Sequence, residues 1–119
     1  MNELIETIFQ NFKVNNISIP ISFLFYEGNE NTYIVYNQAS IENTFSAEDE
    51  LQNYVDYYYF HIYSKGNYLG IVKKVKKLLK QNGFRWQPFM TSSDMYEVDT
   101  GFYHKILCFS IERYEESED

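Results

Sequence analysis

A histidine and a cysteine near the C-terminal end of the sequence are the residues best suited to nucleophilic chemistry. His104 and Cys108 are four positions apart in a segment rich in aromatic and β-branched residues. A histidine that takes the thiol proton makes cysteine a strong nucleophile. A strand advances about 3.3 Å per residue, so the two side chains would be about 13 Å apart, beyond hydrogen-bond reach. We therefore expect no catalytic role for either residue.

Other motifs that carry chemistry are weak or missing. The stretch "DMYEVDTG" places Asp94, Glu97 and Asp99 close together, but without the ligand spacing and central glycine of an EF-hand loop. One cysteine and two histidines are few ligands for a metal site. We find no glycine-rich phosphate loop, GxSxG elbow or HExxH pair. The prediction is a protein that is not an enzyme and holds no cofactor or metal.

The stretch "YVDYYYFHIYSKGNY", residues 54–68, contains six tyrosines and one phenylalanine. A strand period of two divides it into a core face of Tyr58, Phe60 and Ile62 and an opposite face. The opposite face consists of Tyr57, Tyr59, His61 and Tyr63. RNA-recognition sheets stack bases on such aromatics, but their basic-glycine-aromatic signature is absent here. We expect the opposite face to contact a helix or a neighbouring subunit.

Charge and length exclude further classes of function. The 119 residues carry a formal charge of −7, which repels phosphate backbones and argues against specific nucleic-acid binding. No apolar stretch approaches the ~18 residues that span a bilayer, and the acidic start is unlike a secretory signal. We expect no membrane partner, a cytoplasmic location and one folded domain.

Periodicity predicts an α+β fold: an antiparallel sheet of four to five strands, with an N-terminal helix and a central amphipathic helix at about 67–82 packed on it. Asn82-Gly83 gives that helix a stop. The domain should span residues 1–114, and residues 115–119 should form a short, mobile acidic tail. The other expected elements are a helix at 2–12, an edge strand at best at 21–26, strands at 33–38, 84–90 and 103–114, and acidic loops at 41–50 and 91–101.

Residues on single faces of the most periodic segments should form the core. They are Tyr58, Phe60, Ile62, Val75, Leu79, Leu107, Phe109 and Ile111. Trp86 should place its ring in the core and its indole N–H at a rim. Five lysines follow the opposite side of the central helix: Lys73, Lys74, Lys76, Lys77 and Lys80. We expect these lysines to form a solvent-exposed face of the helix. The alternative is that they pair with acidic residues of a partner.

The segment "IENTFSAEDE", residues 41–50, is longer than a tight hairpin needs, and long loops in small domains are often functional. It combines apolar anchors with charges, as interfaces with polar rims do. We expect contact with a neighbouring subunit or another protein of the same assembly through Ile41, Phe45, Glu48, Asp49 and Glu50. A loop that folds back on its own domain is the alternative.

Four stretches in order, "TYIVYNQ", "FSAEDELQNYVDYYYFHIYSKGNYLGIVKKVKKLL", "GFRWQP" and "DMYEVDTGFYHKILCFSIER", resemble the tail completion (tail terminator) proteins of long-tailed phages and prophages of Gram-positive bacteria, from the head-to-tail joining gene cluster. The resemblance covers about residues 20–114. It implies a non-enzymatic structural protein that forms an oligomeric ring, with a hexamer favoured, and that closes the head-proximal end of the tail tube.

The resemblance also implies partners and location: the tail tube protein, a head-closure or connector protein, the host cytoplasm during assembly, and the virion. Six copies would carry a charge of roughly −42, which lets DNA pass an acidic channel without binding. One alternative is a neighbouring head-closure or connector protein. Another is an acidic DNA-mimic or other phage inhibitor, although the carboxylates are scattered and a lysine-rich helix interrupts them.

Overall fold

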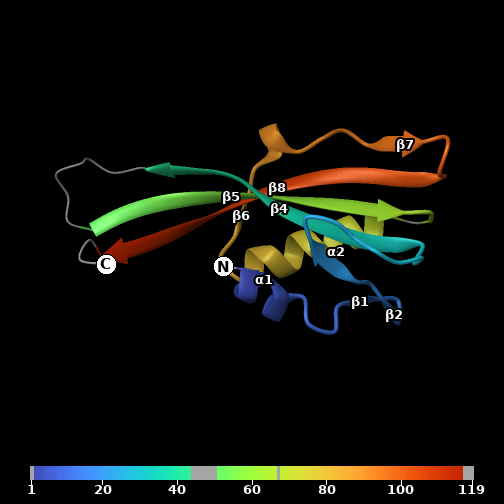
Figure 1. The fold of residues 1–119 in the computed structure, drawn as a ribbon, viewed down its shortest axis with the longest axis horizontal. Coiled ribbons are helices and arrows are strands. Elements are labelled where there is room, and N and C mark those ends of the chain that lie inside the picture. Colours follow the sequence, from blue (N-terminus) through green and yellow to red (C-terminus); the bar gives the residue numbers. More distant parts are fainter. Residues whose placement is uncertain (1, 44–50, 67, 117–119) are drawn as a thin grey trace.

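The computed structural model describes residues 2–43, 51–66 and 68–116 (Figure 1). Two helices and a small hairpin lie on one side of a long twisted sheet, which makes the protein α+β (Figure 1). The elements are α1 (Asn2–Ile8), β1 (Lys13–Val14), β2 (Ile17–Ser18), β3 (Ile21–Phe23), β4 (Thr32–Asn43), β5 (Leu51–Ser64), α2 (Leu69–Gln81), β6 (Arg85–Trp86), the 3₁₀ helix η1 (Pro88–Met90), β7 (Met95–Glu97) and β8 (Phe102–Glu116).

The main sheet has six strands in the order β3-β4-β5-β8-β6, and β7 also pairs with β8. Strands β4, β5 and β8 are antiparallel, whereas β3 runs parallel to β4. The prediction of four to five antiparallel strands is therefore wrong in strand number and in the direction of the edge strand. Parallel neighbours are usually joined by a long crossover that contains a helix. Here β3 has only three residues, so the short connection 24–31 is enough to place β4 beside it in the same direction.

The N-terminal segment differs from its prediction because asparagines turn the chain. Helix α1 ends at Ile8 rather than near Phe12, and Asn11 adopts a left-handed conformation with φ 59°. Asn15 and Asn16 have φ 53° and 66° and form the two-residue turn between β1 and β2. Such a pair suits a type I′ turn, so residues 13–18 form a hairpin, which was not predicted from the sequence.

Helix α2 confirms the most periodic part of the sequence. It runs from Leu69 to Gln81 and buries Ile71, Val72, Val75 and Leu79 against the sheet. Gly83 ends it with φ 92°, and the Phe84 N–H donates to the Leu79 carbonyl. A glycine in the left-handed region relieves the clash that a β-carbon would meet there.

The core lies between the sheet and the helical layer. Seven of the eight predicted core residues have at most 1% of their surface exposed, and Ile111 is half-buried against them. The predicted alternation of β5 is thus confirmed. In β8, Leu107 and Phe109 are buried as predicted, but Cys108 and Ser110 are buried as well. The buried hydrophobic residues are Ile5, Phe9, Phe12, Ile19, Ile34, Tyr36, Tyr58, Phe60, Ile62, Ile71, Val72, Val75, Leu79, Phe84, Leu107, Cys108 and Phe109.

The segment after α2 is less regular than predicted. The expected strand 84–90 shrinks to β6, because Pro88 has no N–H for a sheet ladder and instead starts η1. The expected loop 91–101 contains β7. Trp86, which we expected in the core, is half-buried and packs against the core from its margin.

Three strands extend past the helical layer and form an arm (Figure 1). We define the arm as residues 41–43 of β4, 51–56 of β5 and 111–116 of β8. It begins where the β4–β5 register shifts between Gln38 and Ser40, a β-bulge of the kind that bends a strand. The arm makes the molecule elongated, with principal extents of 51 × 27 × 24 Å.

The arm corrects two predictions. Ile41 was placed in a loop, but it belongs to β4 and lies opposite Asp56 of β5. The last strand runs to Glu116, so the first two residues of the predicted tail are strand residues. Phe45, Glu48, Asp49 and Glu50 lie outside the described residues.

Replacing Phe109 by alanine tests the assignment of core faces. Phe109 is fully buried, and its ring lies 6.0 Å from that of Phe60. We expect Phe109→Ala to lower the free energy of unfolding by ~3–5 kcal/mol. The matched control Phe89→Ala removes a fully exposed ring and should change it by less than about 0.5 kcal/mol. Urea unfolding measures both values, and equal effects of the two changes would contradict the assignment.

Candidate functional site

The sheet has a second face, turned away from the helices, which carries the predicted contact residues. Tyr57, Tyr59, His61 and Tyr63 alternate with the buried residues of β5, and each is half-buried. The structure thus places the four side chains on one face, as the period of two predicted. We call it the aromatic face.

Four rings stack in a continuous row on this face. Tyr26 stacks on Tyr33 with centroids 4.3 Å apart, and Tyr33 stacks on Tyr63 at 4.9 Å. Tyr63 stacks on His104 at 4.1 Å. Tyr63 is directly opposite Tyr33 in β4 and His104 in β8. Cross-strand aromatic pairs of this kind stabilise a sheet, and this row joins its three longest strands.

The stack limits what the aromatic face can bind. Successive rings are inclined by only 19° to 21°, so the faces of the inner rings are covered by other rings. Phe102 adds edge contacts to Tyr33 and Tyr63. A platform for single-stranded nucleic acid needs free ring faces on which bases can stack. This row presents ring edges and hydroxyl groups instead, which suit contact with another protein surface.

Both histidines of the chain meet beside this stack. Asn37 Oδ1 is an acceptor, so His61 donates to it from Nε2 at 3.1 Å. Nδ1 of neutral His61 can then accept from Nε2 of His104, which lies 3.4 Å away. Nδ1 of His104 in turn lies 3.7 Å from a carboxylate oxygen of Glu97. No local pattern predicts this network, because its members come from four strands.

Burial controls the charge of the histidine pair. It lowers the pKa of His61, and the neighbouring His104 lowers it further. Burial also lowers the pKa of His104, although the Glu97 carboxylate opposes this effect. Both rings are therefore neutral near pH 7. A hydrogen bond between two imidazole rings needs at least one neutral ring, because only a neutral ring has a nitrogen that can accept.

Cys108 and His104 have separate surroundings. Cys108 is fully buried, its sulfur lies 4.0 Å from the Met90 sulfur, and burial raises the pKa of its thiol to about 11. Its backbone N–H donates to the hydroxyl of Thr91. His104 uses its ring nitrogens toward His61 and Glu97. A buried thiol that stays protonated is a packing group rather than a nucleophile.

Several large apolar side chains at the margins of the sheet are exposed. Leu24 and Phe25 expose 61% and 64% of their surface and help line a hollow that also contains His61 and Tyr63. Leu24 has φ 75°, a conformation that costs energy for a branched side chain. Phe89 of η1 is fully exposed. Exposed apolar groups beside a patterned face are typical of contact surfaces.

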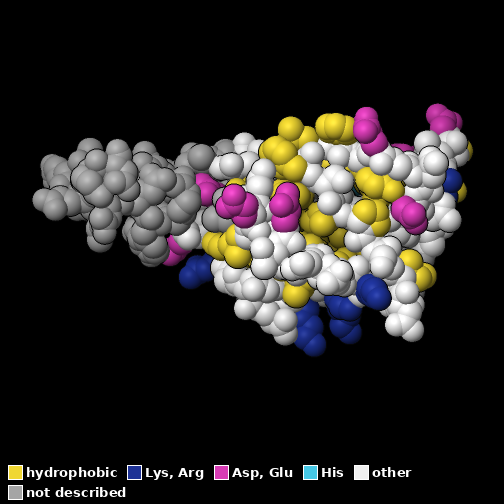
Figure 2. Space-filling view, turned by 60° about the horizontal axis from the view of Figure 1, so that its bottom comes forward, with side chains coloured by type: hydrophobic (Ala, Val, Ile, Leu, Met, Phe, Trp, Pro, Cys, Tyr) yellow, Lys and Arg dark blue, Asp and Glu magenta, His cyan; other side chains and the backbone are white. Residues whose placement is uncertain are grey.

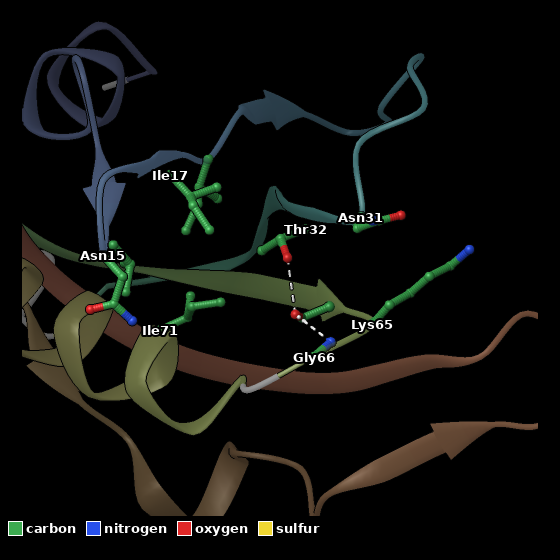
Figure 3. Close-up of a pocket in the computed structure, with 10 residues that line it drawn as sticks. Asn15, Ile17, Asn31, Thr32, Lys65, Gly66 and Ile71 are labelled. Atoms are coloured by element: carbon green, nitrogen blue, oxygen red, sulfur yellow. Dashed lines mark hydrogen bonds between the residues drawn. The ribbon is translucent and has the colours of Figure 1, made fainter.

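A cavity of about 300 Å³ lies on the other side of the molecule, between the β1–β2 hairpin and the start of α2 (Figure 3). Ile17 and Ile71 form part of its apolar wall. At its polar side the Thr32 and Ser64 hydroxyls are 3.0 Å apart, and the Gly66 N–H donates to Ser64 Oγ (Figure 3). Sequence reasoning missed this cavity because its residues come from four separate segments.

Two negative findings apply to the described part of the chain. In residues 2–43, 51–66 and 68–116, no three His, Cys, Asp or Glu side chains converge as metal ligands. In the same residues, no helix is long and apolar enough to cross a membrane. The chain matches no protein-family model and no curated protein sequence.

The histidine pair predicts how stability depends on pH. In the folded protein the pKa values of both histidines lie below the ordinary value of 6.5. As the pH falls below 6.5, the unfolded chain therefore binds more protons than the folded protein does. The stability that the neutral pair contributes is complete above pH 6.5 and is lost as pH falls through the folded-state values. Thermal unfolding between about pH 8 and pH 5 should show this loss for the wild type and a smaller one for His61→Gln/His104→Gln. An equal decline in both proteins would contradict the assignment.

Proposed function

We propose that this chain is a non-enzymatic phage structural protein that forms an oligomeric ring, closes the head-proximal end of a tail tube and helps to join the tail to the head. The resemblance in four ordered stretches of residues 20–114 supplies the class of protein. The arm is the observation in the fold that carries the proposal. Its partners are further copies of this chain, the tail tube protein and a head-closure or connector protein.

The arm is built for contact outside its own molecule. Beyond Tyr36, β4 has no further strand partner on its outer side among the described residues, and β8 has none beyond Ser110. Free strand edges such as these invite pairing with another chain. A neighbouring copy in a ring supplies the missing contacts, because a head-to-tail interface that closes on itself buries the same arm in every copy.

The aromatic face and its margins supply a second contact region in this proposal. Half-buried tyrosines keep apolar rings and hydroxyl groups available together, a combination enriched in protein interfaces. Leu24, Phe25 and Phe89 add exposed apolar surface. The aromatic stack favours protein partners over nucleic acid, and the formal charge of −7 gives DNA no attraction to a surrounding ring.

Shortening the arm tests the proposal. Asn43 and Tyr54 are paired between β4 and β5, so residues 44–53 can be replaced by a two-residue Asn-Gly turn that suits the strand twist. We expect this variant to keep the monomer fold and to lose both ring formation and tail capping. Light scattering measures the oligomer, and electron microscopy with tail tubes shows whether one end is capped.

Circular dichroism and thermal unfolding of the same variant show whether its fold is intact. A shortened protein that still forms rings and caps tubes would move the contact to the aromatic face. A wild-type protein that forms no oligomer and caps no tube, but binds a nuclease or restriction enzyme tightly, would replace the proposal by the acidic-inhibitor alternative.

A further inference from the structure

Positive charge is concentrated on one helix of an acidic protein. Helix α2 carries five of the ten basic residues of the chain and no acidic residue. Several Lys and Arg side chains lie along the lower edge of the molecule in Figure 2, and another lies beside an acidic side chain next to the grey atoms. Within the described residues, no carboxylate lies within ion-pair distance of these five lysines. We call their side of α2 the lysine face.

Three of the lysines are engaged within their own molecule. Lys76 lies 3.7 Å above the ring of Trp86, and Lys80 lies 5.6 Å from the same ring. Lys74 donates to the Lys13 carbonyl. Such cation–π and hydrogen-bond contacts hold the ammonium groups in place.

Lys73 and Lys77 differ from these three. Both side chains are exposed, they are four residues apart on the same side of α2, and neither has a described contact partner. Like charges at this spacing repel each other and destabilise a helix. The crowding of charge also acts on Lys76, whose pKa is lowered by burial and by Lys105 and Lys80. An acidic partner would remove this repulsion.

The complementary charge lies at the other end of the sheet. Besides the buried Asp56, the arm residues 41–43, 51–56 and 111–116 include four acidic residues and one basic residue. Glu115 and Glu116 belong to the arm part of β8, opposite Gln52 and Leu51. The arm projects past the helical layer (Figure 1), so the lysine face of its own molecule does not neutralise it. Charges along a free edge also discourage pairing of arm with arm.

We propose that the acidic arm of one copy docks on the lysine face of the next copy, with Lys73 and Lys77 as its cationic contacts. The contact is head-to-tail, because arm and helix are different surfaces, and repetition of such a contact closes a ring. Opposite charges steer the two surfaces together and fix their register. This inference rests on the proposed self-assembly and names the two surfaces that meet in it.

Charge reversal on the full-length protein tests the contact. We expect Lys73→Glu/Lys77→Glu to weaken self-association at least about tenfold in sedimentation experiments. Lys65→Glu is the matched control for Lys77→Glu alone, because each makes the same change in net charge and Lys65 lies outside α2; the control should change association less. Wild-type association should weaken as salt rises from about 0.05 M to about 0.5 M.

Rescue separates a specific contact from a general effect of charge. Adding Glu115→Lys/Glu116→Lys to the helix variant should restore association, whereas these arm changes alone should weaken it. Equal association of the wild type and the helix variant, with rings still formed, overturns only this inference. A wild type that stays monomeric overturns the proposed ring as well. Loss of DNA binding without loss of association in the helix variant would reassign the lysine face to phosphate contact.

Discussion

Strand β5 pairs with a long strand on each side, and this double pairing positions the rest of the sheet. Its fourteen residues pair with β8 along their whole length and with β4 from Tyr54 to Ser64. Alternation sends Tyr58, Phe60 and Ile62 into the core and the intervening aromatics to the opposite face. Since a shift of one residue would exchange the two faces, the buried set fixes the register of all three long strands.

The same strand links the core to the candidate contact surfaces. On one end its outward residues build the stack of Tyr33, Tyr63 and His104. On the other end it continues past the helices as the middle of the arm. A rigid, doubly paired strand can therefore hold the aromatic face and the arm in a fixed relation. That relation is useful in a ring, where every copy must present both surfaces at the same angle.

Local periodicity explains what the sequence could predict. The alternation of residues 57–63 and the apolar spacing of Ile71, Val75 and Leu79 are decided within a few residues, and both are found in the structure. The parallel edge strand β3 and the histidine pair depend on segments that meet only in the folded chain. The turn at Asn15-Asn16 had a local signal, since asparagine tolerates positive φ, and it was overlooked.

Amide hydrogen exchange of the assembled and dissociated protein shows directly whether the arm is buried between copies. In a single copy, the outward N–H groups of residues 38–43 and 111–116 have no strand partner among the described residues. We expect exchange in these two segments to slow on assembly, while exchange in the core residues 58–62 changes little. Unchanged exchange in both segments, with protection appearing elsewhere, would contradict it.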